Sequence, residues 1–221
     1  MPTSQPTGFL AVPSSGSGPG VLVLHAWWGL NDTIRATCTR LADEGFVAFA
    51  PDLYHGEVAD TIAGAEAMVK ALNANYLQAK AEVDEAARFL SERAARPNDG
   101  LGVIGFSLGA YYALELANDA PDLMRAVVLF YGTGEDDFST SQAAYLGHFA
   151  GDDPYEPQSA VDHLEDALKR AGRPATIHRY PGVGHWFVEP DRSDAYDEAA
   201  ATLAWERTLE FLRESLSSHS G

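Results

Sequence analysis

A serine between two glycines offers the chain's clearest candidate for chemistry. The segment Gly105 to Gly109, which contains Ser107, follows the apolar run Leu101 to Phe106 and opens the apolar stretch Leu108 to Asn118. A serine on a tight turn from strand to helix projects its hydroxyl above the sheet, and glycines two residues away on either side leave room for that turn. The pattern indicates a nucleophile elbow. A helix N-cap serine between packing glycines is the alternative interpretation.

An elbow serine also needs an acid and then a histidine further along the chain. The apolar run Tyr145 to Ala150 is followed by Asp152 and Asp153, and the run Ala175 to Tyr180 leads into a glycine-rich loop that ends in His185. Either aspartate could instead start a turn, and His185 could be a loop histidine with ordinary hydrogen bonds. Their order and placement together favour catalysis, with the choice of aspartate left open.

Two other kinds of site are less well supported. Gly100, Gly102 and Gly105 have the spacing of a dinucleotide-binding fingerprint, but that motif should follow a strand, whereas these glycines precede or lie within one. The histidines form no His-Glu-x-x-His pair, and the chain has a single cysteine. We therefore predict no cofactor and no metal ligand set.

The elements that must position these residues follow an α/β pattern. Short apolar runs alternate with longer amphipathic stretches, and most of the runs lack the alternation of half-exposed strands, as parallel strands buried on both faces should. The pattern predicts a mostly parallel sheet flanked by helices. The apolar runs are Phe9 to Val12, Val21 to Ala26, Phe46 to Ala50, Leu101 to Phe106, Ala126 to Tyr131, Tyr145 to Ala150 and Ala175 to Tyr180.

The connections between these runs suggest how the strands are joined. The segment Pro13 to Gly20 is too short for a crossover helix, so the first two runs are expected to form a hairpin. In the last predicted helix, Trp205, Leu209, Leu212 and Leu216 recur at helical spacing and indicate packing. Helices are predicted from Asn31 or Asp32 to Gly45 and over Thr61 to Ala94, Leu108 to Asn118, Gln158 to Ala171 and Ser193 to Leu216.

Composition limits the possible partners and the size of the fold. The 221 residues carry a net charge of −17, with 46% apolar and 21% charged side chains. This length favours one domain over residues 1–221, with frayed ends at 1–7 and 217–221. A strongly acidic chain repels nucleic acid and anionic membranes. With one cysteine, Cys38, and no long apolar segment, the chain is expected in the cytoplasm without a membrane span.

Five motifs follow one another along the chain. They are His25 to Asn31, Ala50 to Tyr54, the elbow Gly105 to Gly109, Gly151 to Asp153, and Gly184 with His185. Together, and in this order, they resemble the motifs of the dienelactone hydrolase family, and the resemblance covers about residues 8 to 213. It implies an α/β-hydrolase fold without a large lid and an enzyme that hydrolyses carboxylic ester or lactone bonds.

Matching motif to motif implies a role for each residue. Ser107 falls on the family's nucleophile, His185 on its base and Asp153 on its acid, with Asp152 as the alternative acid. The oxyanion hole falls on the backbone amides of Trp27 and Leu108. In the mechanism that this implies, Ser107 attacks the carbonyl, His185 takes its proton, and water then cleaves the acyl-enzyme.

The sequence departs from the archetypal members of the family in three ways. Those members use a cysteine nucleophile, and a glutamate at the position of Ala26 manages its ionisation; a serine deprotonated by histidine needs no such partner. They also bind an anionic substrate with arginines, one of which falls in the stretch where this chain has Val188, Glu189 and Pro190. We therefore expect neutral esters as substrates.

Four aromatic residues flank the predicted catalytic loops: Trp28, Tyr54, Tyr131 and Trp186. They are candidates for an apolar substrate pocket, and packing at the edge of the core is an equally good interpretation. The segment Gly132 to Ala144 leaves no room for a large lid, which suggests an open site and small or medium substrates. The alternative function is a catalytically silent hydrolase-fold protein that binds a ligand in the same cleft.

Overall fold

The computed structural model describes residues 4–94, 100–134 and 137–217. Parts of the two ends predicted to fray, residues 1–3 and 218–221, lie outside the described residues.

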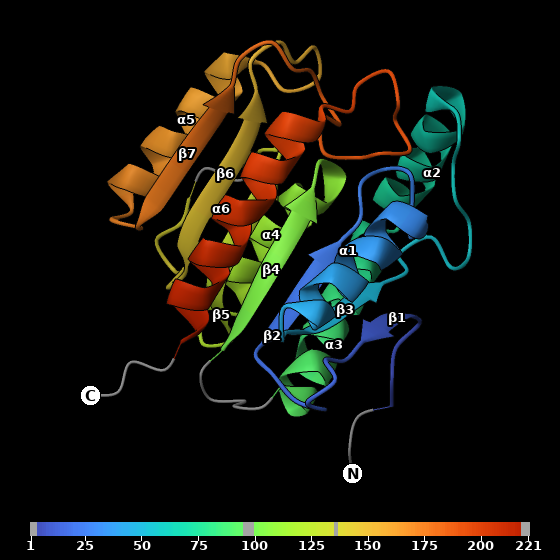
Figure 1. Cartoon of the computed structure of the whole chain (residues 1–221), viewed down its shortest axis with the longest axis vertical. Coiled ribbons are helices and arrows are strands. Elements are labelled where there is room, and N and C mark those ends of the chain that lie inside the picture. The colour runs from blue at the N-terminus through green and yellow to red at the C-terminus, as the bar shows by residue number, and fades with distance from the viewer. Residues whose placement is uncertain (1–3, 95–99, 135–136, 218–221) are drawn as a thin grey trace.

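A seven-stranded sheet runs through the middle of the molecule (Figure 1). Its strand order is β1-β3-β2-β4-β5-β6-β7, and every neighbouring pair is parallel except β1 with β3. This confirms the predicted mostly parallel sheet. The strands are β1 (Gly8–Ala11), β2 (Gly20–Leu24), β3 (Val47–Pro51), β4 (Leu101–Phe106), β5 (Met124–Phe130), β6 (Ala144–Ala150) and β7 (Ala175–Tyr180).

The predicted hairpin between the first two strands is wrong. β1 pairs antiparallel with β3, with Gly8 opposite Pro51 and Ala11 opposite Ala48, while β2 lies between β3 and β4. Both edges of β2 are therefore occupied by parallel partners. The connection Pro13 to Gly20 is long enough to pass over one intervening strand, a distance of about 10 Å.

Helices cover both faces of the sheet, close to the predicted ranges. The predicted helix over Thr61 to Ala94 is in fact two helices, because Asn75 leaves the helical conformation at φ −118° and ψ 32°. The last helix begins at Glu198 rather than Ser193, where the Asp197 carboxylate accepts from the amide of Ala200. The helices are α1 (Asp32–Asp43), α2 (Ile62–Ala74), α3 (Tyr76–Arg93), α4 (Leu108–Asp119), α5 (Gln158–Arg170) and α6 (Glu198–Leu216).

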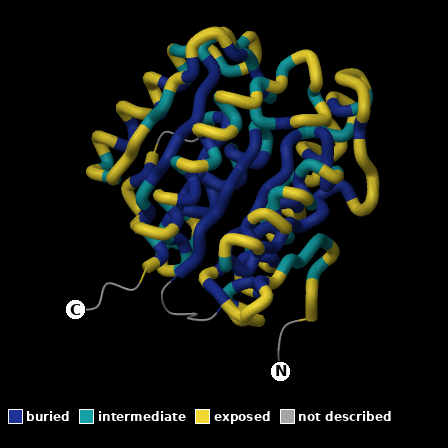
Figure 2. Tube along the Cα trace, in the orientation of Figure 1, coloured by how far each residue is buried: buried dark blue, intermediate teal, exposed yellow. Residues whose placement is uncertain are grey.

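Side chains that alternate along the strands form two hydrophobic clusters, one on each face of the sheet. Leu22 and Leu24 of β2 pack toward α3 and α4, whereas Val21 and Val23 pack toward α1 and α6. Figure 2 shows the buried strands in the centre and the exposed outer sides of the helices. Cys38 is fully buried in the second cluster, and burial raises the pKa of its thiol to about 12, so it remains an unreactive thiol.

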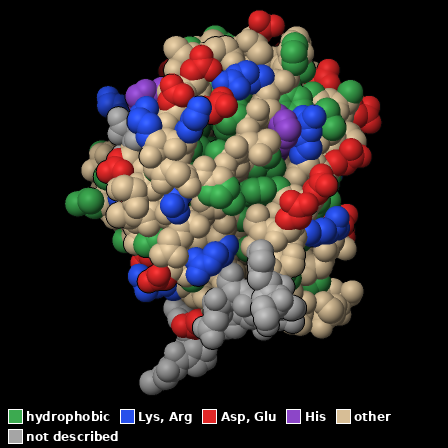
Figure 3. Space-filling view, turned by 90° about the vertical axis from the view of Figure 1, so that its left-hand side faces the viewer, with side chains coloured by type: hydrophobic (Ala, Val, Ile, Leu, Met, Phe, Trp, Pro, Cys, Tyr) green, Lys and Arg blue, Asp and Glu red, His purple; other side chains and the backbone are tan. Residues whose placement is uncertain are grey.

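The surface carries charges of both signs. On the face shown in Figure 3, Lys and Arg side chains lie singly or in small groups among Asp, Glu and uncharged side chains. Among the ion pairs of the described residues, Arg179 on β7 pairs with Asp162 and Glu165 of α5. Within the described ranges, no helix is long and apolar enough to cross a bilayer.

The parallel arrangement brings six loops to one edge of the sheet. These loops follow β2 to β7, and the carboxyl ends of parallel strands meet at a common edge, where ligands usually bind in such sheets. The segments that contain Trp27, Tyr54, Ser107, Asp153 and His185 all lie in these loops. The sheet therefore gathers the predicted site residues from distant parts of the chain.

Candidate active site

Ser107 occupies a strained turn between β4 and α4. Its backbone has φ 49° and ψ −109°, a positive φ that non-glycine residues rarely adopt. A Cβ at Gly105 would lie 2.4 Å from the carbonyl oxygen of Gly109, and a Cβ at Gly109 would lie 2.2 Å from that of Leu24. Both positions therefore require glycine. The turn has the geometry expected for a nucleophile elbow.

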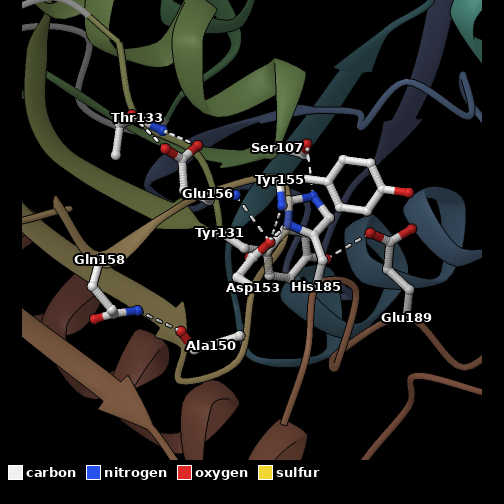
Figure 4. A network of polar contacts seen from close by, with 10 residues as sticks. All are labelled: Ser107, Tyr131, Thr133, Ala150, Asp153, Tyr155, Glu156, Gln158, His185 and Glu189. Carbon is white, nitrogen blue, oxygen red and sulfur yellow. Dashed lines mark hydrogen bonds and ion pairs between the residues drawn. The ribbon is translucent and has the colours of Figure 1, made fainter. Parts of the chain in front are cut away.

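A chain of two hydrogen bonds connects Ser107 to a buried carboxylate through His185 (Figure 4). His185 Nε2 lies 3.0 Å from Ser107 Oγ, and His185 Nδ1 lies 2.7 Å from Asp153 Oδ2. The side chains of His185 and Asp153 are only 4% and 1% exposed. Because a carboxylate only accepts, the Nδ1 nitrogen carries the proton and Nε2 is free to accept one from the serine. This arrangement can remove the proton of Ser107 as its oxygen attacks an electrophile.

The loop after β6 decides which aspartate contacts the histidine. Asp153 Oδ1 accepts from the amides of Tyr155 at 2.9 Å and Glu156 at 3.0 Å, which leaves Oδ2 directed at His185. Asp152 is exposed, and its amide donates to the carbonyl of Val183. The Asp153 side chain, and not that of Asp152, is the one hydrogen-bonded to the imidazole.

Glu156 anchors this acid-bearing loop to the loop after β5. Its carboxylate accepts from the amide of Thr133 at 3.0 Å and from the Thr133 hydroxyl at 2.7 Å (Figure 4). Partial burial raises the pKa of Glu156, and the two hydrogen bonds from Thr133 oppose that shift. Gln158 adds a second anchor, because its side-chain amide donates to the carbonyl of Ala150. Asp153 therefore sits in a loop braced on both sides.

Tyr131 and Glu189 lie next to the imidazole of His185. The Tyr131 ring centre is 4.7 Å from that of His185, and its hydroxyl donates to Glu189 Oε1 at 2.6 Å. Glu189 is 1% exposed, and burial raises its pKa to about 8. In the sequence, Glu189 stands out only as the residue in place of an arginine. The available signal was that Glu189 is the one acidic residue in the otherwise apolar stretch Trp186 to Pro190, whose apolar side chains indicate a buried segment.

Two main-chain N–H groups near the serine have no acceptor. In the described part of the chain, the amides of Trp27 and Leu108 make no hydrogen bond. The glycine contact at Gly109 shows that the first turn of α4 packs against the end of β2, next to the loop that contains Trp27. Both residues are partly buried, and the first N–H groups of a helix such as α4 have no partner within the helix. They are suited to bind a developing oxyanion.

The four predicted pocket aromatics do not share one environment. Trp28, Tyr54 and Tyr131 are 2%, 7% and 0% exposed, so they pack beneath the loops, whereas Trp186 is half-buried and contacts His185 edge-on. The structure adds Tyr155, which is not among the residues predicted to line the pocket. Its ring lies 5.1 Å from that of His185, and it is 46% exposed. Its position two residues after Asp153 was the available signal.

Among the residues that the structure describes, no group of three or more His, Cys, Asp or Glu side chains is placed to hold a metal ion.

Known proteins are similar to this chain in sequence. The dienelactone hydrolase family model matches residues 7–216. "Protein usf" of Aquifex pyrophilus is 34% identical over 95% of this chain and 93% of its own. A Bradyrhizobium protein named "Probable 2-oxo-3-(5-oxofuran-2-ylidene)propanoate lactonase" is 32% identical over 93% of this chain and 88% of its own.

A solved structure gives the same result for the fold. The crystal structure of a dienelactone hydrolase-like promiscuous phosphotriesterase from metagenomic libraries superposes with a TM-score of 0.81. The two chains are 24% identical, and the match covers 91% of this chain and 88% of the other, so this likeness shows the fold alone. Since the family match extends over nearly all of the sheet, the elbow and the loops around it, the chain belongs to the dienelactone hydrolase family of α/β-hydrolase enzymes.

Proposed function

We propose that this enzyme cleaves carboxylic ester or lactone bonds through an acyl-enzyme formed on Ser107. The observation that carries the proposal is the continuous contact from Ser107 through His185 to Asp153, with 3.0 Å and 2.7 Å between the bonded atoms. This order of hydroxyl, imidazole and carboxylate is the one needed to activate a serine.

In the first half of the reaction, Ser107 Oγ forms a bond to the substrate's carbonyl carbon while its proton moves to His185 Nε2. The carbonyl oxygen becomes an oxyanion and accepts from the amides of Trp27 and Leu108. When the tetrahedral intermediate collapses, the bond to the alcohol oxygen breaks, and that oxygen takes the proton from His185. The acyl group remains as an ester on Ser107; for a lactone, the alcohol stays attached to it.

Water completes the reaction in the second half. His185 accepts a proton from water, and the resulting hydroxide oxygen attacks the acyl carbon of the ester on Ser107. Collapse of the second tetrahedral intermediate returns the proton to Ser107 and releases a carboxylic acid. Asp153 keeps the Nδ1 proton in place throughout and stabilises the imidazolium that forms in each half.

The residue at position 26 agrees with a serine nucleophile. Ala26 is 1% exposed and adds no ionisable group beside the elbow. A thiolate needs a group that controls its ionisation, whereas a serine hydroxyl is neutral until His185 removes its proton. The combination of Ala26 with Ser107 therefore supports general-base activation of the nucleophile.

We expect small or medium neutral substrates. The carboxylates of Asp153, Glu156 and Asp191 lie near the catalytic loops, and the whole chain carries −17. Like charge repels an anionic substrate from such a site. The lactonase name of the Bradyrhizobium relative supports lactones as one substrate class beside open-chain esters.

The test is a short-chain p-nitrophenyl ester assay combined with a serine-directed fluorophosphonate probe. The wild-type enzyme should hydrolyse the ester and be labelled at Ser107, and Ser107→Ala should lose both properties. Ser15→Ala, which changes an exposed serine, is the matched control and should retain both. A panel of matched neutral and anionic esters then tests the preference for neutral substrates.

Two results would reject parts of the proposal. Full esterase activity in Ser107→Ala would exclude the acyl-enzyme mechanism. If the folded wild-type protein neither hydrolyses any ester of the panel nor reacts with the probe, the alternative of a catalytically silent binding protein would be supported instead.

A further inference from the structure

A second buried histidine, His25, lies at the end of β2 next to the loop that contains Trp27. It is 1% exposed, and its ring packs against that of Tyr54 at 5.0 Å between ring centres. Its Nδ1 lies 2.7 Å from the carbonyl oxygen of Ala26, and the amide nitrogen of Leu53 lies 3.3 Å from its Nε2. The mechanism above does not use this side chain.

The two partners of His25 determine where its proton lies. The amide of Leu53 can only donate, so Nε2 must accept, and the carbonyl of Ala26 can only accept, so Nδ1 must donate. The ring is therefore a neutral imidazole with its proton on Nδ1. A proton on Nε2 would face the Leu53 N–H with a second donor. Burial lowers the pKa of His25 and so favours the same neutral state.

The carbonyl that His25 contacts belongs to the peptide group that also contains the Trp27 N–H. In a planar trans peptide, the C=O and the N–H point in opposite directions, so fixing one fixes the other. The carbonyl oxygen of Ala26 also accepts from the amide of Gly29 at 3.1 Å, and Gly29 has φ 90°. Two donors thus hold one end of this peptide group, and its N–H at the other end makes no hydrogen bond to any residue that the structure describes.

The loop after β3 supplies a fixed support on the other side of His25. Asp52 accepts from the amide of Tyr54 at 3.2 Å and from that of Gly56 at 2.7 Å, and these bonds close the turn that presents the Leu53 N–H. The imidazole of His25 therefore connects the loop after β2 to the loop after β3 and fixes their relative positions.

We propose that His25 is a positioning residue that orients the Trp27 amide as an oxyanion donor by hydrogen bonding to the Ala26 carbonyl. The inference rests on the proposed function, because it requires that the Trp27 amide binds the oxyanion. The hydrogen bond on the carbonyl also polarises the peptide group and makes its N–H a stronger donor. His25 acts through this peptide and does not itself touch the substrate.

Two substitutions separate the two contacts of the ring. In His25→Asn, the side-chain amide reaches the position of Nδ1 and can still donate to Ala26. In His25→Gln, the longer side chain reaches the position of Nε2 and can still accept from Leu53, but it loses the donor to Ala26. A role that is only structural predicts similar activity losses in both variants, whereas the proposed role predicts that Gln is much worse.

The expected result is a specific loss of transition-state binding in His25→Gln. Its kcat should fall at least about tenfold with KM nearly unchanged, and a trifluoromethyl ketone inhibitor should bind weaker by a similar factor, since its adduct places an oxyanion at the same amides. His25→Asn should stay within about threefold of wild type in both measurements. Equal losses in the two variants would overturn the inference.

His148→Gln provides the matched control. His148 is also fully buried with two side-chain partners, Tyr180 and Thr208, but it lies on β6, which β4 and β5 separate from β2. It should lose thermal stability while keeping kcat and inhibitor affinity close to wild type. The loss of activity in each variant is compared with the loss of thermal stability in the same variant. If this ratio is equal in His148→Gln and His25→Gln, the effect of His25 is general destabilisation and the inference fails.

A measurement on the wild-type protein covers the case in which the variants do not fold. Nitrogen-15 NMR of the imidazole should show the Nδ1–H tautomer of His25 at every pH at which the protein is folded. A proton on Nε2 would overturn the inference. Failure of the proposed function looks different: Ser107→Ala would then remain active, whereas loss of activity in Ser107→Ala with wild-type behaviour in His25→Gln rejects only the role of His25.

Discussion

The hydroxyl of Tyr131 donates to Oε1 of Glu189 at 2.6 Å, and both residues are buried next to the imidazole of His185. Tyr131 reaches this position with a positive φ of 39°, which few non-glycine residues adopt. Burial raises the pKa of Glu189 to about 8, so its carboxyl is mainly protonated at neutral pH. The site therefore contains two buried acids with different roles: Asp153 contacts His185 directly, whereas Glu189 holds the tyrosine that packs against it.

The first prediction concerns the pH dependence of stability. The pKa of Glu189 in the folded protein lies above its ordinary value of 4.5, so its contribution to stability is complete below pH 4.5 and is lost as pH rises through about 8. Relative to Glu189→Gln, the free energy of unfolding of the wild type should therefore fall with pH, by at most about 1.4 kcal/mol per pH unit. Urea unfolding between about pH 5 and pH 8 measures this difference.

Glu210→Gln serves as the control for that experiment, because Glu210 is exposed on α6. Its stability profile should run parallel to that of the wild type. A parallel profile for Glu189→Gln as well would show that Glu189 does not titrate abnormally.

The second prediction distinguishes the two neighbouring aspartates. Asp153→Asn should lower kcat by about 10³- to 10⁴-fold, because the amide no longer holds the Nδ1 proton or stabilises the imidazolium. Asp152→Asn should stay close to wild type, since Asp152 is exposed. Steady-state kinetics on one neutral ester compare them. A large loss in Asp152→Asn with little loss in Asp153→Asn would reverse the assignment.

The third prediction tests the packing of the elbow. Gly109→Ala should be destabilised by several kcal/mol or fail to fold, because the new Cβ would meet the backbone oxygen of Leu24 at 2.2 Å. Gly172→Ala is the control: its φ is 69° and no atom lies within 4 Å of the new Cβ, so only backbone strain of about 1–2 kcal/mol applies. Thermal melts of both variants should differ widely, and similar melts would argue against the close contact of α4 with β2.

The fourth prediction assigns substrate contact to an exposed ring. Tyr155 is 46% exposed beside His185 and Trp27, so Tyr155→Ala should raise KM for aryl esters several-fold with little change in stability. Tyr196→Ala removes a ring with similar exposure, 36%, and its KM should not change, because the described ring contacts of His185 are with Tyr131, Tyr155 and Trp186. Equal KM values in both variants would show that substrate does not reach Tyr155.

Much of the fold follows from local sequence patterns. The apolar runs predicted the strands, and the amphipathic stretches predicted the helices, because the type of an element depends on spacing within a short window. The partners of each strand do not depend on such a window. The hairpin prediction failed for this reason: Pro13 to Gly20 specifies a short connection, but only the complete sheet places β3 against β1.

The sequence predicted the identity of the site residues more easily than the hydrogen bonds between them. Ser107 and His185 stood out because glycine-rich turns after apolar runs mark loops at the edge of a parallel sheet. The residues alone left Asp152 and Asp153 as equal candidates, since adjacent positions differ only in the direction of their side chains. The hydrogen bonds of the folded loop direct Asp153 toward the imidazole.

The sequence by itself determined the α/β class, the elbow and the family, because these are encoded in residue types and spacings along the chain. Only the tertiary structure decided that Glu189 is buried beneath Tyr131, that Tyr155 lies beside His185, and that His25 bridges two loops. These contacts join residues that are distant in the chain. They depend on the directions of side chains and on interatomic distances that must be correct to a few tenths of an ångström. Such geometry arises only when the sheet and its loops are packed together.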